Sequence, residues 1–128
     1  MTSRLAAVVI DAVQPGLIAD FWCAVLGWQV AGQDDDGVIT IGPAGQDWPA
    51  IDIAPVPETK TIKNRLHLDL RADGVPVAAE LDRLLSLGAR PADAGQPADA
   101  SWVVLADPEG NEFCLLSRTV QEVQSPAD

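Results

Sequence analysis

Apolar residues recur along the first part of this chain with the spacing of a strand and then of a helix. Between Leu5 and Val30, a short apolar run is followed by a polar turn containing Pro15. Apolar side chains then recur at helical spacing: Ile18, Phe21, Trp22 and Val25. The helix should end at Leu26-Gly27, because glycine readily takes the left-handed conformation of a C-terminal cap. The pattern predicts a strand and then a helix of about three turns.

The stretch from Arg65 to Ala92 repeats the same plan. Its strand is followed by a turn containing Pro76, near the predicted helix start, where proline loses no internal hydrogen bond. The apolar positions of the second helix are Val77, Leu81, Leu84 and Leu85, and the helix should end at Leu87-Gly88. The two copies are offset by about 60 residues, measured from Ala7 to His67.

Shorter apolar segments follow each predicted helix and have the lengths of strands. Those of the first half are Gln29 to Ala31, Val38 to Ile41 and Ala50 to Ala54; those of the second are Ala89 to Pro91, Trp102 to Ala106 and Glu112 to Leu116. Each half therefore has the order β-α-β-β-β. We predict one domain over residues 1–128, with a first module at about 4–56, a linker at about 55–64 and a second module at about 64–118. Modules of this size seldom bury a sheet alone, so the halves should share a core.

Composition and charge narrow the kinds of partner. Eight basic against 19 acidic residues give a net charge of −11, and 48% of the residues are hydrophobic. Such a surface repels nucleic acid and anionic membranes, so we expect neither as a partner. The N-terminal apolar run ends at Asp11, too short for a spanning helix and without a signal-peptide pattern, which favours the cytoplasm. Cys23 and Cys114 are too few for a disulfide scaffold and should be reduced thiols.

Four stretches carry a resemblance to a known family: FWCAVLGW (Phe21 to Trp28), PVPETKTIKNRLHLDLR (Pro55 to Arg71), the Leu-Gly helix end, and WVVLADPEGNEFCLL (Trp102 to Leu116). With the doubled β-α-β-β-β order, the chain resembles the vicinal oxygen chelate superfamily, which includes glyoxalase I, bleomycin-resistance proteins and extradiol dioxygenases. Its glyoxalase-like branch is the nearest in pattern. The resemblance implies an α+β fold in which the two modules pair into a curved mixed sheet around a cleft. It also implies a homodimer.

Metal-dependent members of the superfamily hold their ion with His, Gln or Glu from the first and last strands of each module. The corresponding positions here are Ala7 and about Asp52 in the first module, and His67 and Cys114 in the second. Only His67 is a usual ligand in its usual place. We therefore expect no cofactor, although one histidine, one carboxylate and one thiol could still hold a divalent metal such as zinc.

His67 is the only histidine of the chain and lies in an alternating stretch, NRLHLDLR. Alternation places Arg65, His67, Asp69 and Arg71 on one face and three leucines on the other. His67 is either a cleft-lining acid or base or a structural residue bonded to a neighbouring strand; we favour a site role. Asp69 either orients a bound group or forms a salt bridge with Arg65 or Arg71.

Glu112 and Cys114 alternate with Phe113 and Leu115 and should also line the cleft face. Glu112 is either the acid/base partner of His67 or a carboxylate bonded to the DPEGN turn. The turn itself should be stabilised by three residues: Asp107 and Asn111 bond nearby backbone, and Gly110 accepts a positive φ.

Further ligand-binding candidates are Asp11, Trp48, Asp52, Trp102 and Cys114. Asp11 shares the face of Ala7, and the two tryptophans would suit a flat hydrophobic ligand. Lys60, Lys63, Asn64 and Arg65 form a basic cluster, either a clamp for an acidic substrate or, as we prefer, a patch that neutralises carboxylates.

These residues support two main hypotheses. One is a metal-independent lyase or isomerase that uses His67 with Glu112 or Asp69 for proton transfer. The alternative is a non-catalytic protein that sequesters a small molecule, as bleomycin-resistance relatives do; an acidic protein would suit a cationic ligand. A third is a module that binds a protein partner. The sequence contains neither a phosphate-binding glycine loop nor a serine-nucleophile motif.

Overall fold

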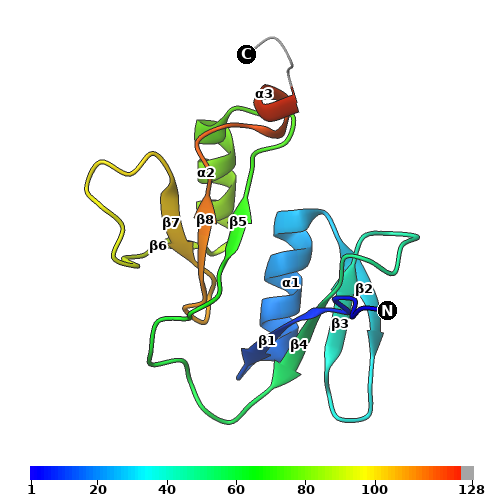
Figure 1. Ribbon diagram of the computed structural model, residues 1–128. Helices are drawn as coiled ribbons and strands as arrows, with labels where there is room; N and C mark the ends of the chain where they lie inside the picture. The colour runs from blue at the N-terminus through cyan, green and yellow to red at the C-terminus, as the bar shows by residue number, and fades with distance from the viewer. Residues whose placement is uncertain (125–128) are drawn as a thin grey trace. The chain divides into compact units, whose positions relative to one another are not determined.

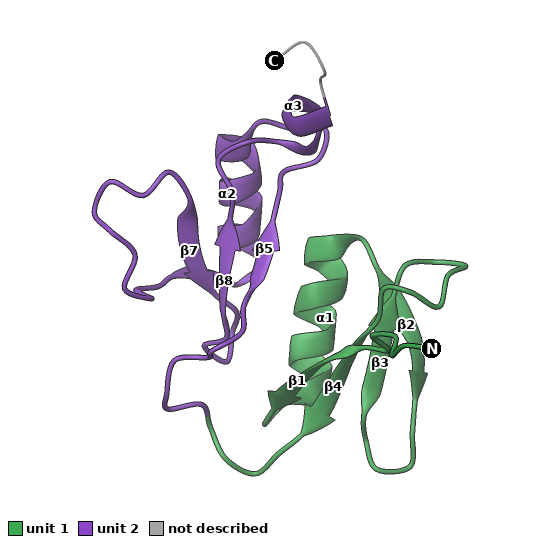
Figure 2. Cartoon of the chain, viewed as in Figure 1, with its two compact units in different colours: residues 1–59 green, residues 60–128 purple. Residues whose placement is uncertain are grey.

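Residues 1–124 are described in a computed structural model of the chain (Figure 1). They fall into two compact units, residues 1–59 and the part of the chain from residue 60 onward (Figure 2). Each unit has its own four-stranded sheet and one long helix. We describe each unit by itself.

The first unit contains β1 (Val8–Ala12), α1 (Pro15–Leu26), β2 (Gln29–Gln33), β3 (Ile39–Gly42) and β4 (Ile51–Pro55). Its strands lie in the order β1-β4-β3-β2. The β1–β4 pair is parallel and the other two pairs are antiparallel, so the sheet is mixed. Helix α1 contacts all four strands.

The core of the first unit follows the predicted helical stripe. Ile18 and Trp22 of α1 are fully buried, as are Ile41 and Ile53 of the sheet. The helix starts with Pro15 and ends at Gly27, whose φ of 68° is left-handed and whose N–H donates to the carbonyl of Cys23. The predicted cap is thereby confirmed, since residues other than glycine are strained in this conformation.

The second unit repeats this topology. It contains β5 (Leu68–Leu70), α2 (Val77–Leu87), β6 (Arg90–Pro91), β7 (Val103–Ala106), β8 (Glu112–Leu115) and a short α3 (Val120–Gln124). The strand order is β5-β8-β7-β6, with β5 parallel to β8. Gly88 caps α2 with a φ of 116°. Leu84, Leu105, Phe113 and Leu115 are fully buried and form the core.

Two features of the second unit differ from the sequence prediction. Strand β5 is shorter than the alternating stretch and begins one residue after His67. The ladder with β8 begins at Leu68 opposite Phe113, while the N–H of Asn64 donates to the side chain of Glu112 instead. Helix α3 was not predicted, because its apolar content is low.

The DPEGN turn joins β7 to β8 as the sequence predicted. Asp107 is fully buried, and its Oδ1 accepts hydrogen bonds from the N–H groups of Glu109 and Asn111 at 2.9 and 3.0 Å. Its Oδ2 accepts from the side-chain amide of Asn111 at 2.9 Å. Gly110 has a φ of 90°. Asp107, Gly110 and Asn111 thus stabilise the turn.

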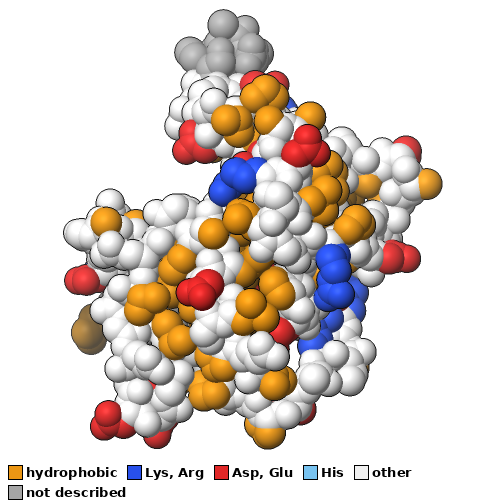
Figure 3. Space-filling view, turned by 180° about the vertical axis from the view of Figure 1, so that it is seen from behind, with side chains coloured by type: hydrophobic (Ala, Val, Ile, Leu, Met, Phe, Trp, Pro, Cys, Tyr) orange, Lys and Arg blue, Asp and Glu red, His pale blue; other side chains and the backbone are white. Residues whose placement is uncertain are grey.

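The predicted α+β class is confirmed, with two mixed sheets built on one plan. Both cysteines are free, Cys23 in α1 and Cys114 in β8. None of the helices in residues 1–124 has the length and hydrophobicity needed to span a bilayer. Hydrophobic side chains reach the surface in both units, for example Val9 and Leu66. The face in Figure 3 carries several such side chains beside separate carboxylates.

Candidate functional site

The pairing of β5 with β8 brings sequence-predicted residues together within the second unit. Asp69 lies directly opposite Cys114, flanked by the pairs Leu68–Phe113 and Leu70–Leu115. Phe113 and Leu115 are buried in the core. Because successive side chains point to opposite faces of a sheet, Asp69 and Cys114 lie on the face away from these two side chains.

His67 completes a compact cluster with these two residues. One ligand atom from each of His67, Asp69 and Cys114 lies within 4.8 Å of the other two. The distance from His67 Nδ1 to Asp69 Oδ1 is 3.5 Å. The side chains of His67 and Asp69 are 40% and 52% exposed, whereas Cys114 is 6% exposed. The cluster therefore has a buried thiol beneath two groups that solvent and solutes can reach.

Electrostatics keeps the thiol of this cluster protonated. Burial raises the pKa of Cys114 above its ordinary value of 9.0, and the negative charge and hydrogen bond of Asp69 raise this pKa further, while Lys63 lowers it. A protonated thiol is a poor nucleophile. Asp69 thus interacts with both the thiol of Cys114 and the imidazole of His67, and can orient the imidazole.

Glu112 has a different environment. Its Oε2 lies 2.9 Å from Nζ of Lys60, and its Oε1 accepts from the N–H of Asn64 at 3.1 Å. Burial raises the pKa of Glu112, but the hydrogen bonds from Lys60 and Asn64 outweigh it and bring the pKa below the ordinary 4.5. The side-chain amide of Asn64 also donates to Asn111 in the DPEGN turn at 2.9 Å. Both oxygens of Glu112 therefore hold the chain around residues 60–64 against β8.

Lys60 and Asn64 belong to the basic cluster of the sequence analysis. The Lys60–Glu112 ion pair, with side chains only 19% and 10% exposed, agrees with the preferred interpretation of that cluster as a neutralising patch. Lys63 differs, because its Nζ donates to the carbonyl of Asn64 and its charge acts on Cys114.

The first unit carries the remaining candidates from β1 and β4. Asp52 of β4 lies opposite Val9 of β1. The corresponding pair of the second unit is Cys114 of β8 opposite Asp69 of β5. Oδ1 of Asp52 accepts a hydrogen bond of 2.6 Å from Oγ1 of Thr40. Asp11 is exposed on β1, and Trp48 is 48% exposed between β3 and β4. Asp52 therefore has a partner within its own sheet.

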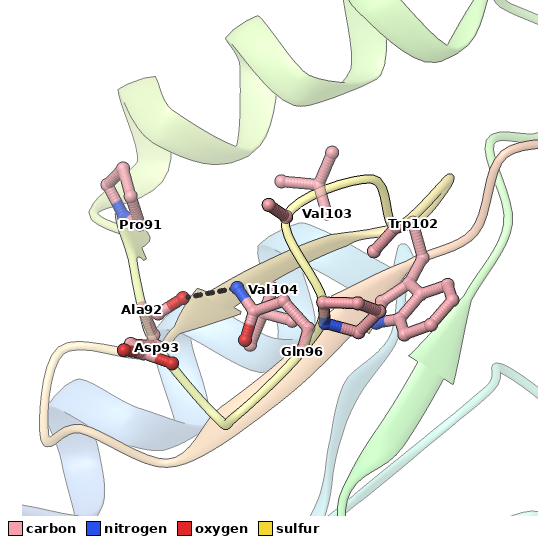
Figure 4. Close-up of a pocket in the computed structure, with 10 residues that line it drawn as sticks. Pro91, Ala92, Asp93, Gln96, Trp102, Val103 and Val104 are labelled. Atoms are coloured by element: carbon pink, nitrogen blue, oxygen red, sulfur yellow. Dashed lines mark hydrogen bonds between the residues drawn. The ribbon is translucent and has the colours of Figure 1, made fainter.

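A pocket of about 440 Å³ lies at the β6–β7 end of the second unit (Figure 4). The pocket is shallow and open to solvent, although its volume is within the range of small-molecule sites. Trp102, which the sequence predicted as a ligand residue, forms one side of it. The other lining residues are Pro91, Ala92, Asp93, Gln96, Pro97, Ala98, Ala100, Val103 and Val104.

A loop that no sequence motif marks as functional forms most of this pocket. Gln96 holds the loop in shape: its Oε1 accepts from the N–H of Ala94 at 2.8 Å and its Nε2 donates to the carbonyl of Ala92 at 3.2 Å. Asp93 accepts from the N–H of Gly95. The only sequence signal was a run of Pro, Ala, Asp and Gly after β6, which is typical of any surface loop.

Strand register connects the pocket to the cluster. Val104, which lines the pocket, lies directly opposite Cys114 on β8, and Cys114 lies opposite Asp69 on β5. Residues directly opposite each other on paired strands share a face of the sheet. The side chain of Val104 therefore shares one face of the second sheet with the cluster, while Val103, which also lines the pocket, points to the other face.

Two β-α-β-β-β units in one chain define the fold of the vicinal oxygen chelate superfamily. A family model described as a glyoxalase-like domain matches residues 7–116, so the chain belongs to the glyoxalase-like domain family. A search among curated proteins gives no match.

Solved structures share the fold at low sequence identity. The fosfomycin resistance protein FosX from Listeria monocytogenes is 15% identical, with 96% of this chain and 97% of that chain covered at a TM-score of 0.69. A glyoxalase/bleomycin resistance protein/dioxygenase family enzyme from Burkholderia phytofirmans PsJN is 20% identical. The match covers 88% of this chain and 97% of that chain at a TM-score of 0.64. A third structure is a point mutant of FosX from L. monocytogenes, complexed with Mn(II) and 1S,2S-dihydroxypropylphosphonic acid. It is 13% identical, and the match covers the whole of both chains at a TM-score of 0.67.

The residues present do not match the metal-ligand pattern that the resemblance implies. Ala7 has no donor atom, and Asp52 is already bonded to Thr40. In the second unit, Cys114 stands where the superfamily typically uses His, Gln or Glu. Instead, His67, Asp69 and Cys114 form a donor cluster inside one unit.

Proposed function

We propose that this glyoxalase-like protein binds a small organic molecule on the face of the second sheet that carries His67, Asp69 and Cys114. We further propose that it acts on this molecule as a metal-independent lyase or isomerase. The observation that carries the proposal is that Asp69, Cys114 and the pocket-lining Val104 lie in register on one face of β5, β8 and β7. The pocket would hold the body of the ligand and the cluster its reactive end.

His67 is the proton-transfer group in this proposal. Its Nδ1 is the nitrogen near Asp69, which leaves Nε2 to exchange a proton with the ligand. An imidazole can accept a proton from one position of the ligand and return it to another, or to a leaving group. Asp69 stabilises the imidazolium between these steps. Glu112 supports this arrangement from outside, because its two oxygens hold the chain just before His67.

The pocket indicates the kind of ligand. Trp102 offers a partly exposed indole for a flat ring, and Asp93 offers a carboxylate at the rim. An aromatic ring and a carboxylate together favour a ligand with an apolar ring and a basic group. For the first unit, a ligand contact by Asp11, Trp48 or Asp52 stays a prediction, as do the homodimer and the cytoplasmic location.

The alternative function is sequestration of a small cationic molecule without conversion. The net charge of −11 favours it, because an acidic surface attracts cations. Both functions use the same pocket, so a binding measurement alone does not separate them.

The experiment starts from any ligand that stays bound through purification, identified by mass spectrometry and then followed for conversion by NMR. For the enzyme, we expect His67→Ala to abolish turnover and to change Tm by no more than a few degrees, because the side chain is 40% exposed. Arg65→Ala, an exposed neighbour, is the matched control and should keep turnover.

Other results would contradict the enzyme. Stoichiometric binding with the ligand recovered unchanged would favour sequestration. Turnover that survives His67→Ala would refute proton transfer by His67, and a joint loss of fold would show that the histidine is structural.

A further inference from the structure

The cluster in the second unit joins three different kinds of metal donor. His67 offers an imidazole nitrogen, Asp69 a carboxylate oxygen and Cys114 a sulfur, all within 4.8 Å of one another. These are the three donor types that zinc accepts in proteins, and catalytic zinc sites commonly use three protein ligands with one open position. Ligand number and chemistry are therefore those of a zinc site.

The backbone holds these donors together without help from the first unit. Asp69 and Cys114 face each other in the β5–β8 register, and His67, the residue just before β5, places its Nδ1 3.5 Å from Oδ1 of Asp69. Cys114 is at the bottom of the cluster, while His67 and Asp69 are half exposed. An ion can therefore enter past His67 and Asp69.

We propose that His67, Asp69 and Cys114 form a metal site, contained in the second unit, that takes a thiophilic divalent ion such as Zn²⁺ rather than Mn²⁺. The Mn²⁺ ion prefers carboxylate, carbonyl and water oxygens, whereas thiolate is a soft donor that favours zinc. A binding ion displaces the proton of the Cys114 thiol, and the resulting thiolate and the carboxylate of Asp69 supply two negative charges for a divalent cation. Cys114 therefore determines which metal binds, and FosX, whose structure holds Mn(II), would differ from this chain in that respect.

This site goes beyond the proposed function and is tested without any enzyme assay. A histidine nitrogen that coordinates an ion has no lone pair left to accept a proton. An ion on Nδ1, the nitrogen near Asp69, leaves the imidazole hydrogen on Nε2, which then has no lone pair with which to accept a proton from the ligand. A bound ion would inhibit the proposed metal-independent reaction.

The test uses Co²⁺ as a spectroscopic probe for zinc. The full-length protein, purified without a metal-affinity step and stripped with a chelator, is titrated with CoCl₂. We expect a thiolate-to-cobalt charge-transfer band in the near ultraviolet at one equivalent, which ZnCl₂ abolishes and excess MnCl₂ leaves intact. Calorimetry with ZnCl₂ gives the affinity directly.

The two cysteines provide a matched pair of variants. Cys114→Ser should lose the charge-transfer band, and its Zn²⁺ affinity should fall at least about tenfold, since losing even an outer partner of a ligand costs about 10–100-fold. Cys23→Ser, in α1 of the first unit, should keep both. His67→Ala and Asp69→Asn change exposed side chains and should each weaken Zn²⁺ binding with Tm preserved.

Three results would overturn the proposal. These are the absence of a charge-transfer band in the wild type, a band that survives Cys114→Ser, and loss of the band in Cys23→Ser. Should Cys114→Ser fail to fold, unchanged Zn²⁺ affinity in His67→Ala and Asp69→Asn would also reject it. None of these readouts depends on turnover, so failure of the metal site and failure of the proposed function are distinguishable.

Discussion

The buried carboxylate of Asp107 provides a direct test of what holds the second sheet together. Asp107→Ala removes the acceptor for three hydrogen bonds, from two backbone N–H groups and the side-chain amide of Asn111. The turn residues Glu109, Gly110 and Asn111 are half-buried, so water can replace part of what is lost. At about 1 kcal/mol for each net bond, the free energy of unfolding should fall by about 3 kcal/mol. For a chain of this size, Tm should fall by roughly 10–15 °C.

Asp107→Asn is the isosteric control. It keeps one oxygen for the two backbone donors but sets an amide against the amide of Asn111. Asn111 cannot simply flip, because its oxygen accepts from Asn64 at 2.9 Å. We expect a smaller loss, about 1–2 kcal/mol, and partial recovery in the double variant D107N/N111D.

Urea unfolding followed by tryptophan fluorescence, together with thermal unfolding by circular dichroism, gives both quantities. A cost below about 0.5 kcal/mol for Asp107→Ala would refute the reasoning, since a fully buried carboxylate with three partners should matter more than that. Equal stability of Asp107→Asn and wild type would refute the proposed role of the Asn111–Asn64 contact.

Two further predictions concern stability. Because the pKa of Glu112 is lowered in the folded state, the stabilisation by its pair with Lys60 is fully present above the ordinary pKa of 4.5 and is lost as the pH falls below it. Glu112→Gln should therefore reduce stability at pH 7 and flatten its fall below pH 4.5, measured by urea unfolding across pH; an unchanged acid profile would contradict this. Gly27→Ala should cost about 1 kcal/mol because of its left-handed φ, whereas Gly16→Ala, inside α1 with open space around it, should raise stability by up to about 1 kcal/mol. Equal effects of the two glycine changes in thermal unfolding would rule out the cap argument.

Local patterns predicted most of the elements. The helical stripe of α1, the glycine caps at Gly27 and Gly88, and the DPEGN turn all depend on residues within a few positions of one another. Such signals depend only on the order of residues within a short segment. The start of β5 was less well predicted, because a strand begins where its partner offers hydrogen bonds, and that partner is β8, more than forty residues later.

In the candidate site, too, local pattern predicted some features and contacts between distant residues decided the others. Alternation alone placed His67 and Asp69 on one face of a strand, and placed Glu112 and Cys114 together on another. The parallel register decided that Asp69 meets Cys114, and Lys60, 52 residues from Glu112, decided that this carboxylate serves as an anchor. No local pattern predicts which of the two carboxylates, Asp69 or Glu112, forms an ion pair with a lysine.

The sequence by itself determined the doubled β-α-β-β-β plan, because hydrophobic periodicity and capping are properties of short segments. Only the tertiary structure decided that one imidazole, one carboxylate and one thiol gather within 4.8 Å in the second unit, in register with the pocket-lining Val104. The physical reason is that strand register and loop closure depend on contacts between distant parts of the chain. These contacts bring three of the four candidate residues into one cluster, while the fourth, Glu112, holds the chain before His67 against β8.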